Sequence, residues 1–166
     1  MAKRYRILLK WVLYSLGFLV VAILNTVVLG DRTFFGTKLS LVPVYVCCVA
    51  CREGHEAGGF FALGCALVWA LSGITGGPAF VLLLPVSAIV AGFFCTAWLT
   101  QSLLPTLAFC LLSLVLCEGG VYVLRLFLSQ PMPSNALELL GLQILLSMIP
   151  APICWGVVRL MGKVGA

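Results

Sequence analysis

The stretch WVLYSLGFLVVAILNTVVL, residues 11–29, decides the class of fold. It contains no charged residue, and Lys3, Arg4, Arg6 and Lys10 stand before it. A helix of about 20 apolar residues crosses the hydrocarbon layer of a membrane, which is about 30 Å thick. The run is longer than the usual apolar region of a signal peptide and lacks a small-x-small cleavage site. We therefore predict an uncleaved first membrane span whose basic start stays in the cytoplasm.

The rest of the chain has the composition of a membrane protein. Of its 166 residues, 63% are hydrophobic and 9% are charged, whereas a soluble domain carries about 25% charged residues. This excludes a water-soluble globule, a disordered chain, a coiled coil and a disulfide scaffold. The ten Lys and Arg residues are spread through an apolar chain, so no basic face for nucleic acid is expected. The length leaves no room for a second domain, and we predict one integral membrane domain over residues 1–166.

Five further apolar runs follow the first one. They cover residues 39–51, 57–71, 79–99, 103–128 and 137–158. The run 39–51 is short and contains Pro43, so by itself it could be a re-entrant or buried segment instead of a crossing. The fold class that we predict is all-α, a polytopic helix bundle with six transmembrane helices.

The distribution of basic residues favours six crossings over five. An even number places both termini on the same side, and seven of the ten basic residues then face the cytoplasm: Lys3, Arg4, Arg6, Lys10, Arg52, Arg159 and Lys163. The others, Arg32, Lys38 and Arg125, fall on or near the opposite side. A five-crossing chain would expose either the basic N-terminus or the basic tail outside, against the positive-inside tendency. We expect both termini in the cytoplasm.

Small residues recur every four positions through the second and third apolar runs. They are Ala50, Gly54, Gly58, Ala62, Ala66 and Ala70. On a helix this spacing makes one nearly straight stripe, and small residues let a neighbouring backbone approach closely within a membrane. A comparable patch in the fourth run consists of Ser87, Ala88, Ala91 and Gly92. We predict that the third and fourth spans pair through these faces, with a partner-binding face as the alternative.

Glu118 is the one acidic residue deep in an apolar run. At about 1.5 Å per residue it lies about 15 Å from the external end of its span, near the bilayer centre. Tyr122 and Arg125 follow at i+4 and i+7, so the three side chains are predicted to form a polar line. Two roles stay open for Glu118, a transport or coupling site and a buried interhelical tie. The single amides Asn25 and Gln143 are predicted to make interhelical hydrogen bonds.

The eight cysteines lie in or at the ends of apolar runs, and we interpret them as small core residues. Cys47, Cys51 and His55 recur at i, i+4 and i+8, with a glutamate beside the histidine, and residues 48–51 match the C-x-x-C spacing. This pattern suggests a metal site. Because Gly54 and the charged turn around it are expected to interrupt the helix, we favour apolar packing and expect no metal and no cofactor.

Glycine spacing is most distinctive across residues 41–92. The pattern consists of the run with Pro43, the Glu53-Gly54 turn, Gly58-Gly59 followed by Gly64 and LVWALSG at 67–73, and an apolar run ending at Gly92. This order of features resembles the MreD family, the membrane component of the bacterial rod-shape and cell-wall elongation machinery, along nearly the whole chain. Where that family commonly has Asp after the aromatic residue, this sequence has Ala70.

The resemblance implies a six-span protein of the bacterial inner membrane that works by holding partners. In architecture it would be similar to the substrate-binding subunits of energy-coupling-factor vitamin transporters. The implied partner is MreC, and through it RodA, a class B penicillin-binding protein and MreB filaments.

The residues themselves point to a non-catalytic protein. With one His and five acidic residues in the whole chain, most hydrolytic and metal-dependent mechanisms lack the side chains they need. We expect a scaffold subunit and no enzyme. The alternative is a small-molecule transporter subunit, in which Glu118, Tyr122 and Arg125 would line a ligand pocket.

Overall fold

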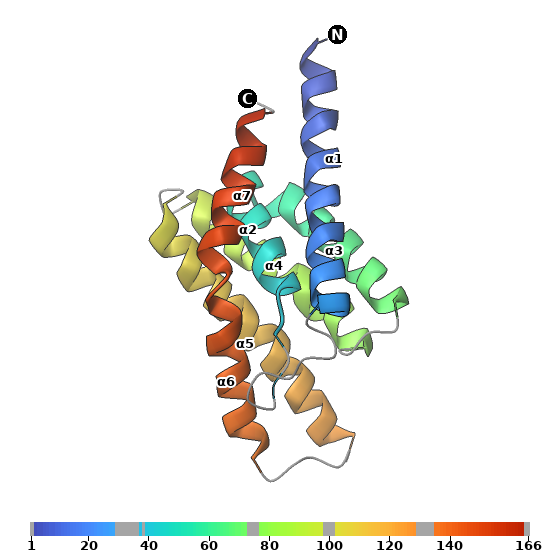
Figure 1. Ribbon diagram of the computed structural model, residues 1–166, viewed down its shortest axis with the longest axis vertical. Coiled ribbons are helices and arrows are strands. Elements are labelled where there is room, and N and C mark those ends of the chain that lie inside the picture. The colour runs from blue at the N-terminus through green and yellow to red at the C-terminus, as the bar shows by residue number, and fades with distance from the viewer. Residues whose placement is uncertain are drawn as a thin grey trace.

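The computed structural model describes residues 2–28, 37, 39–72, 77–97, 102–128 and 135–164. Within these ranges the chain is helical and contains no strand, which confirms the predicted all-α class (Figure 1). The elements are α1 (Ala2–Ile23), which continues into the π-helical turn η1 (Leu24–Val28), α2 (Val42–Glu53), α3 (His55–Leu71), α4 (Gly77–Ala97), α5 (Leu103–Phe127), α6 (Ala136–Met148) and α7 (Ala151–Val164).

Among the described residues, four helical segments are long and apolar enough to cross a membrane. They are Tyr5–Val27, Ala79–Ala97, Leu103–Phe127 and Ala136–Lys163, the last formed by α6 and α7 together. These segments coincide with the first, fourth, fifth and sixth predicted runs. The two remaining runs form the shorter helices α2 and α3, so the number of six crossings stays a prediction.

Helix α2 lies at the centre of the bundle. It has 12 residues, or about 18 Å, which is less than the hydrocarbon thickness. Every residue from Val42 to Cys51 is buried, because α1, α3, α4, α5 and α7 all pack against this helix. Pro43 occupies its first turn, where a missing N–H is tolerated. Its C-terminus is set by Gly54, whose φ of 93° lies in the left-handed region that favours glycine.

The backbone that leads into α2 is non-helical and buried, so its amides need partners inside the bundle. The Ser40 N–H donates to the Ser147 hydroxyl of α6 at 2.9 Å, and the Leu41 N–H donates to the Asn25 side-chain oxygen of η1 at 3.4 Å. The second bond confirms the prediction that Asn25 joins two segments. The two side-chain oxygens accept the hydrogen bonds that backbone carbonyl groups would accept in a regular helix.

Small residues bring α2, α3 and α4 into close contact. A Cβ atom added at Gly58 would lie 2.5 Å from the Ala50 Cα, and one added at Gly92 would lie 2.9 Å from the backbone at Gly54 and His55. Ala62, Ala66 and Ala88 are also buried, whereas Ala70 is half-buried. The α3–α4 contact is the most extensive among the described helices, which confirms the predicted pairing.

One part of the stripe prediction is wrong. The chain turns at Gly54, so Ala50 belongs to α2 and faces Gly58 of α3 instead of lying in line with it. The buried members of the stripe are used for packing within the chain. They leave no free small-residue face for a partner at these positions.

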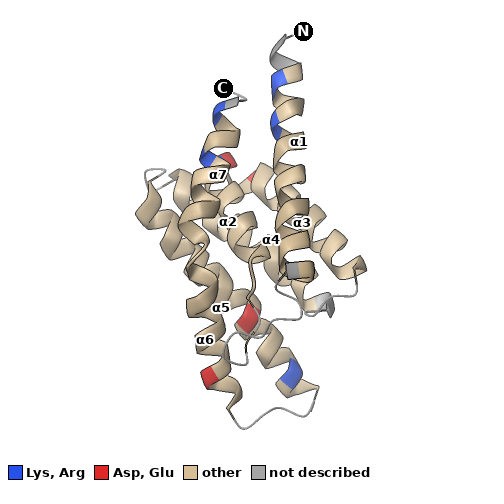
Figure 2. Ribbon diagram, in the orientation of Figure 1, with Lys and Arg blue, Asp and Glu red and all other residues tan. Residues whose placement is uncertain are grey.

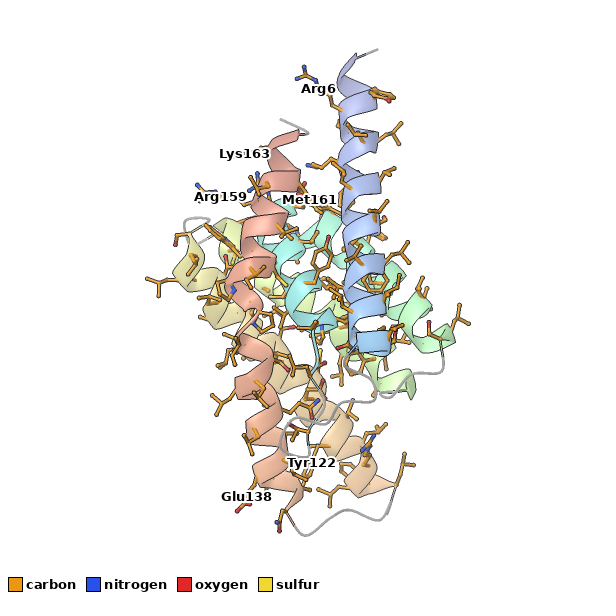
Figure 3. The ribbon with its side chains drawn as sticks, in the orientation of Figure 1. Arg6, Tyr122, Glu138, Arg159, Met161 and Lys163 are labelled. Atoms are coloured by element: carbon orange, nitrogen blue, oxygen red, sulfur yellow. The ribbon has the colours of Figure 1, made fainter. Side chains whose placement is uncertain are left out.

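The two termini lie at the same end of the molecule's long axis, and the α5–α6 end lies opposite (Figure 1). The Lys and Arg residues of α1 and α7 gather at the end with the termini (Figure 2). Arg6, Arg159 and Lys163 lie towards that end, and Tyr122 and Glu138 towards the opposite end (Figure 3). The remaining basic residues predicted for the opposite side, at positions 32 and 38, are outside the described residues.

Candidate functional site

The first candidate site is centred on Glu118 of α5. Its carboxyl group interacts with the side chains of Ser40, just before α2, and Gln143 of α6. Arg125, which is exposed, adds a favourable electrostatic interaction. Tyr122 is half-buried one turn further along α5, towards the α5–α6 end (Figure 3). The predicted interhelical hydrogen bond of Gln143 stays a prediction.

The contacts of Glu118 are those expected of an interhelical tie. Three segments far apart in sequence meet at its carboxyl group, and one of them is the start of α2. The N-terminal end of a helix carries unpaired N–H groups and a partial positive charge, which an acidic side chain complements. A role in transport or coupling stays a prediction.

A second polar cluster, which was not predicted from the sequence, joins α1 to the end of α2. The Lys10 ammonium group forms an ion pair with Glu53, and the Tyr14 hydroxyl donates to the other Glu53 oxygen at 2.8 Å. Tyr45 of α2 then donates its hydroxyl to the Tyr14 carbonyl oxygen at 3.0 Å. The ion pair is largely buried, with 19% of the Lys10 and 12% of the Glu53 side chain exposed.

The local reasons for this cluster are simple. Lys10 and Tyr14 are four residues apart and therefore share a face of α1. Glu53 is the last residue of α2, whose preceding turns are buried. A glutamate at the end of a buried helix needs a partner, and this requirement is the signal that could have identified the cluster.

The third cluster consists of five buried cysteines from α2, α4 and α5: Cys47, Cys48, Cys51, Cys95 and Cys110. The Sγ atoms of Cys51 and Cys95 are 3.0 Å apart, and those of Cys48 and Cys110 are 3.6 Å apart. All eight cysteines are free thiols, and seven are buried, as the interpretation as core residues predicted. That interpretation did not predict that five of them would gather in one cluster.

The metal-site pattern is not assembled in this fold. As predicted, the helix is interrupted at Gly54, so His55 starts α3 and leaves the line of Cys47 and Cys51. Its ring packs edge-on against Phe93 of α4, with centroids 5.9 Å apart. Within the described ranges, no group of three or more His, Cys, Asp or Glu side chains is arranged to hold a metal ion.

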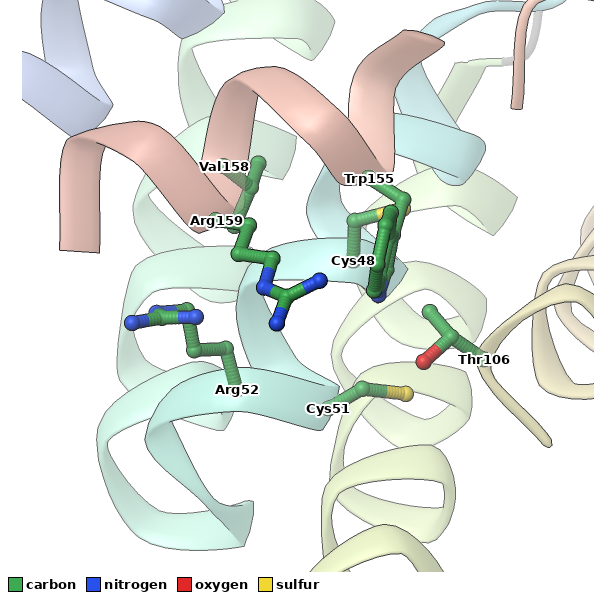
Figure 4. Close-up of a pocket in the computed structure, with 7 residues that line it drawn as sticks. All are labelled: Cys48, Cys51, Arg52, Thr106, Trp155, Val158 and Arg159. Atoms are coloured by element: carbon green, nitrogen blue, oxygen red, sulfur yellow. The ribbon is translucent and has the colours of Figure 1, made fainter. Parts of the chain in front are cut away.

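A small pocket lies between α2, α5 and α7 (Figure 4). Its lining residues are Cys48, Cys51, Arg52, Thr106, Trp155, Val158 and Arg159. The volume is about 20 Å³, which is room for about one water molecule. The Arg159 guanidinium carbon lies 4.9 Å from the centroid of the Trp155 ring, a cation–π contact. From the sequence, Arg52 and Arg159 were interpreted only as markers of membrane orientation.

Comparison with known proteins identifies no relative. No family model, no curated protein and no solved structure matches this chain. The fold therefore defines only a class of protein: in the part of the chain that the structure describes, it is all-helical, with four helices suited to crossing a membrane that are tied together by buried polar contacts.

Proposed function

We propose that this chain is a non-catalytic scaffold subunit of the bacterial cell-wall elongation machinery, related to the MreD family. It holds MreC in the inner membrane and, through MreC, the synthases RodA and a class B penicillin-binding protein together with MreB filaments. The family relation rests on the glycine pattern of residues 41–92. The mode of action rests on how the polar groups of the bundle are used.

The observation that carries the proposal is that buried polar groups join helices instead of surrounding a ligand. Glu53 binds two side chains of α1, and Glu118 binds one residue before α2 and one in α6. Pockets for small molecules measure about 300–1,000 Å³. The pocket between α2, α5 and α7 is more than tenfold smaller than that. A bundle whose buried polar groups join its own helices is better suited to binding other proteins than to binding a small molecule.

The same observation separates the scaffold from the transporter alternative. In a substrate-binding subunit, Glu118, Tyr122 and Arg125 would face a common ligand cavity. The carboxyl group of Glu118 instead interacts with Ser40 and Gln143 inside the bundle. The contacts favour the scaffold.

The topology that belongs to this proposal has six crossings and both termini in the cytoplasm. Two features support it: the termini lie at one end of the molecule, and the Lys and Arg residues of α1 and α7 gather there (Figure 2). Helices α2 and α3 supply the second and third crossings, α2 with the non-helical residues that precede it. Cysteine-free tags at the two termini, probed from either side of the membrane, test this arrangement.

The test of function is depletion of the protein in its rod-shaped host, followed by capture of its partners. We expect rounded cells, and copurification in mild detergent of a single-span protein with a large outer domain. Normal cell shape with lost uptake of a vitamin, or copurification with ATPase-linked membrane subunits, would favour the transporter instead.

The partner-binding surface can be located with a photo-crosslinking residue placed at exposed apolar positions. Leu16 of α1, Leu67 of α3, Leu82 of α4 and Leu145 of α6 are each more than 40% exposed, so substitution there leaves the core intact. Leu84, which is fully buried, is the matched control. Crosslinks to MreC from one of the exposed positions support the proposal, and crosslinks from none of them contradict it.

A further inference from the structure

We propose that the pocket between α2, α5 and α7 binds the phosphate group of an anionic lipid through Arg52 and Arg159. This inference concerns lipid binding and does not depend on the proposed scaffold function. It starts from the fact that two arginines from different helices line the same small pocket, with the Arg159 guanidinium directed towards its other lining residues and the Arg52 guanidinium at its edge, beside Gly162 (Figure 4). Arginine is well suited to phosphate because its planar group offers several N–H donors to the oxygens.

Both arginines are held in position by contacts with their surroundings. The Arg159 guanidinium lies over the Trp155 ring at 4.9 Å. Arg52 follows the buried part of α2, and its guanidinium packs against Gly162 of α7, where a Cβ atom would collide with it. Arg52 also interacts electrostatically with Tyr14. Positioned donors lose less conformational entropy when a ligand binds than mobile surface side chains do.

The size of the pocket fits one phosphate oxygen better than a whole ligand. A volume of about 20 Å³ accepts one atom the size of a water oxygen. The remainder of the phosphate and the glycerol would lie at the open mouth, beside the exposed Arg159 side chain. Such an arrangement suits a lipid headgroup whose acyl chains stay in the bilayer.

The position of the pocket along the membrane normal fits the level of the lipid headgroups. The apolar segment formed by α6 and α7 ends at Lys163, and Arg159 lies four residues before this end, or about 6 Å. Headgroup regions add about 5–7 Å on each side of the hydrocarbon layer. Basic pockets between helices at this level are typical binding sites for anionic headgroups, and tryptophan is common there. A lipid is therefore favoured over free phosphate.

The experiment measures binding of phosphatidylglycerol to the purified full-length protein in mild detergent, by native mass spectrometry and by the shift in melting temperature. Diacylglycerol has the same tails without the phosphate and serves as the lipid control. Inorganic phosphate tests for a free anion. We expect phosphatidylglycerol to bind and stabilise the protein, and diacylglycerol and inorganic phosphate to do neither.

Two pairs of variants assign the binding to this pocket. Arg159→Gln removes a lining charge, whereas Lys163→Gln removes an equal charge four residues away on the same helix. Gly162→Ala displaces the Arg52 guanidinium without changing charge, whereas Gly156→Ala adds the same methyl group in open space on α7. We expect Arg159→Gln and Gly162→Ala to weaken binding of phosphatidylglycerol by about tenfold or more, and each control to keep it within about twofold of the unsubstituted protein.

Three results would overturn the proposal. One is equal binding of diacylglycerol and phosphatidylglycerol, which would mean that the tails alone are recognised. Another is equal loss of binding in Arg159→Gln and Lys163→Gln, which would indicate general electrostatic attraction. The third is stabilisation by inorganic phosphate without any effect of the lipid, which would assign the pocket to a free anion.

Discussion

Replacing Gly58 with alanine tests how closely α2 and α3 are packed. The added Cβ would lie 2.5 Å from the Ala50 Cα and 2.7 Å from the Ala50 Cβ, whereas carbon atoms in contact are about 3.5–4.0 Å apart. Helices α2 and α3 would have to move apart by about 1 Å, because the atom nearest to the added Cβ is the backbone Cα of Ala50. Overpacking of this kind costs about 1–3 kcal/mol. Alanine recovers about 0.5–1 kcal/mol of helix stability, so we expect a net loss of about 1–2 kcal/mol.

The assay uses the cysteines of the protein itself. Seven of the eight thiols are buried, so a thiol-reactive fluorophore reports unfolding as the temperature rises. A loss of 1 kcal/mol lowers the melting temperature of a chain of this size by about 2–4 °C, so Gly58→Ala should melt about 2–8 °C lower. Gly64→Ala on the same helix is the control, because no atom lies within 4 Å of its added Cβ. If Gly58→Ala melts at or above the temperature of Gly64→Ala, the close α2–α3 contact is refuted.

Three further predictions concern the buried clusters. Glu53→Gln leaves the Lys10 charge without its partner and should cost up to about 3 kcal/mol, and the double variant with Lys10→Met should recover most of this in a double-mutant cycle. A membrane-permeant azo oxidant should remove one hydrogen from each of Cys51 and Cys95 and join them by a disulfide, which reduces the titratable thiols from eight to six. Glu118→Gln should keep nearly the stability of the unsubstituted protein, whereas Glu118→Leu should lose about 1–3 kcal/mol because it leaves hydrogen-bonding groups unpaired.

Each of these predictions has a matched control. Glu138→Gln changes an exposed acid on α6 and should leave the melting temperature unchanged. Cys65→Ser removes a buried thiol outside the cysteine cluster and should leave the oxidation intact, whereas Cys95→Ser should abolish it. Persistence of eight titratable thiols after oxidation would contradict the Cys51–Cys95 contact. Equal losses in Glu118→Gln and Glu118→Leu would indicate that the charge itself is required.

Most helices could be predicted because they correspond to apolar runs, although the run 137–158, predicted as one span, is divided between α6 and α7. Residues 103–128 were predicted as one span and form α5, and residues 57–71 nearly coincide with α3. The apolar content fixes where a helix can run in lipid, so these boundaries follow from composition alone. The interruption of the helix at Gly54 was predicted, but the straight stripe of small residues through this position was wrong. Spacing by four carried the stripe of small residues through Gly54, but the positive φ at this glycine ends α2 there.

The clusters could not be predicted because their members are far apart in sequence. Lys10 and Glu53 are 43 residues apart, and Cys51 and Cys95 are 44 apart. Periodicity relates residues within one helix and carries no information about which helices become neighbours. The same limit applies to Glu118, for which local spacing suggested Tyr122 as a neighbour in a polar line. Its side-chain interactions are instead with two other segments, and the residue just before α2 supplies one partner.

The hydrogen bond from the Ser40 amide to the Ser147 hydroxyl sets an order for biosynthesis. The two residues are 107 positions apart, and at about 5–20 residues per second the ribosome adds Ser147 about 5–20 s after Ser40. During translation, this amide has no Ser147 to bind until α6 has been synthesised. A nascent chain that stops before residue 136 lacks this acceptor. The centre of the bundle is therefore completed by the last part of the protein to be made.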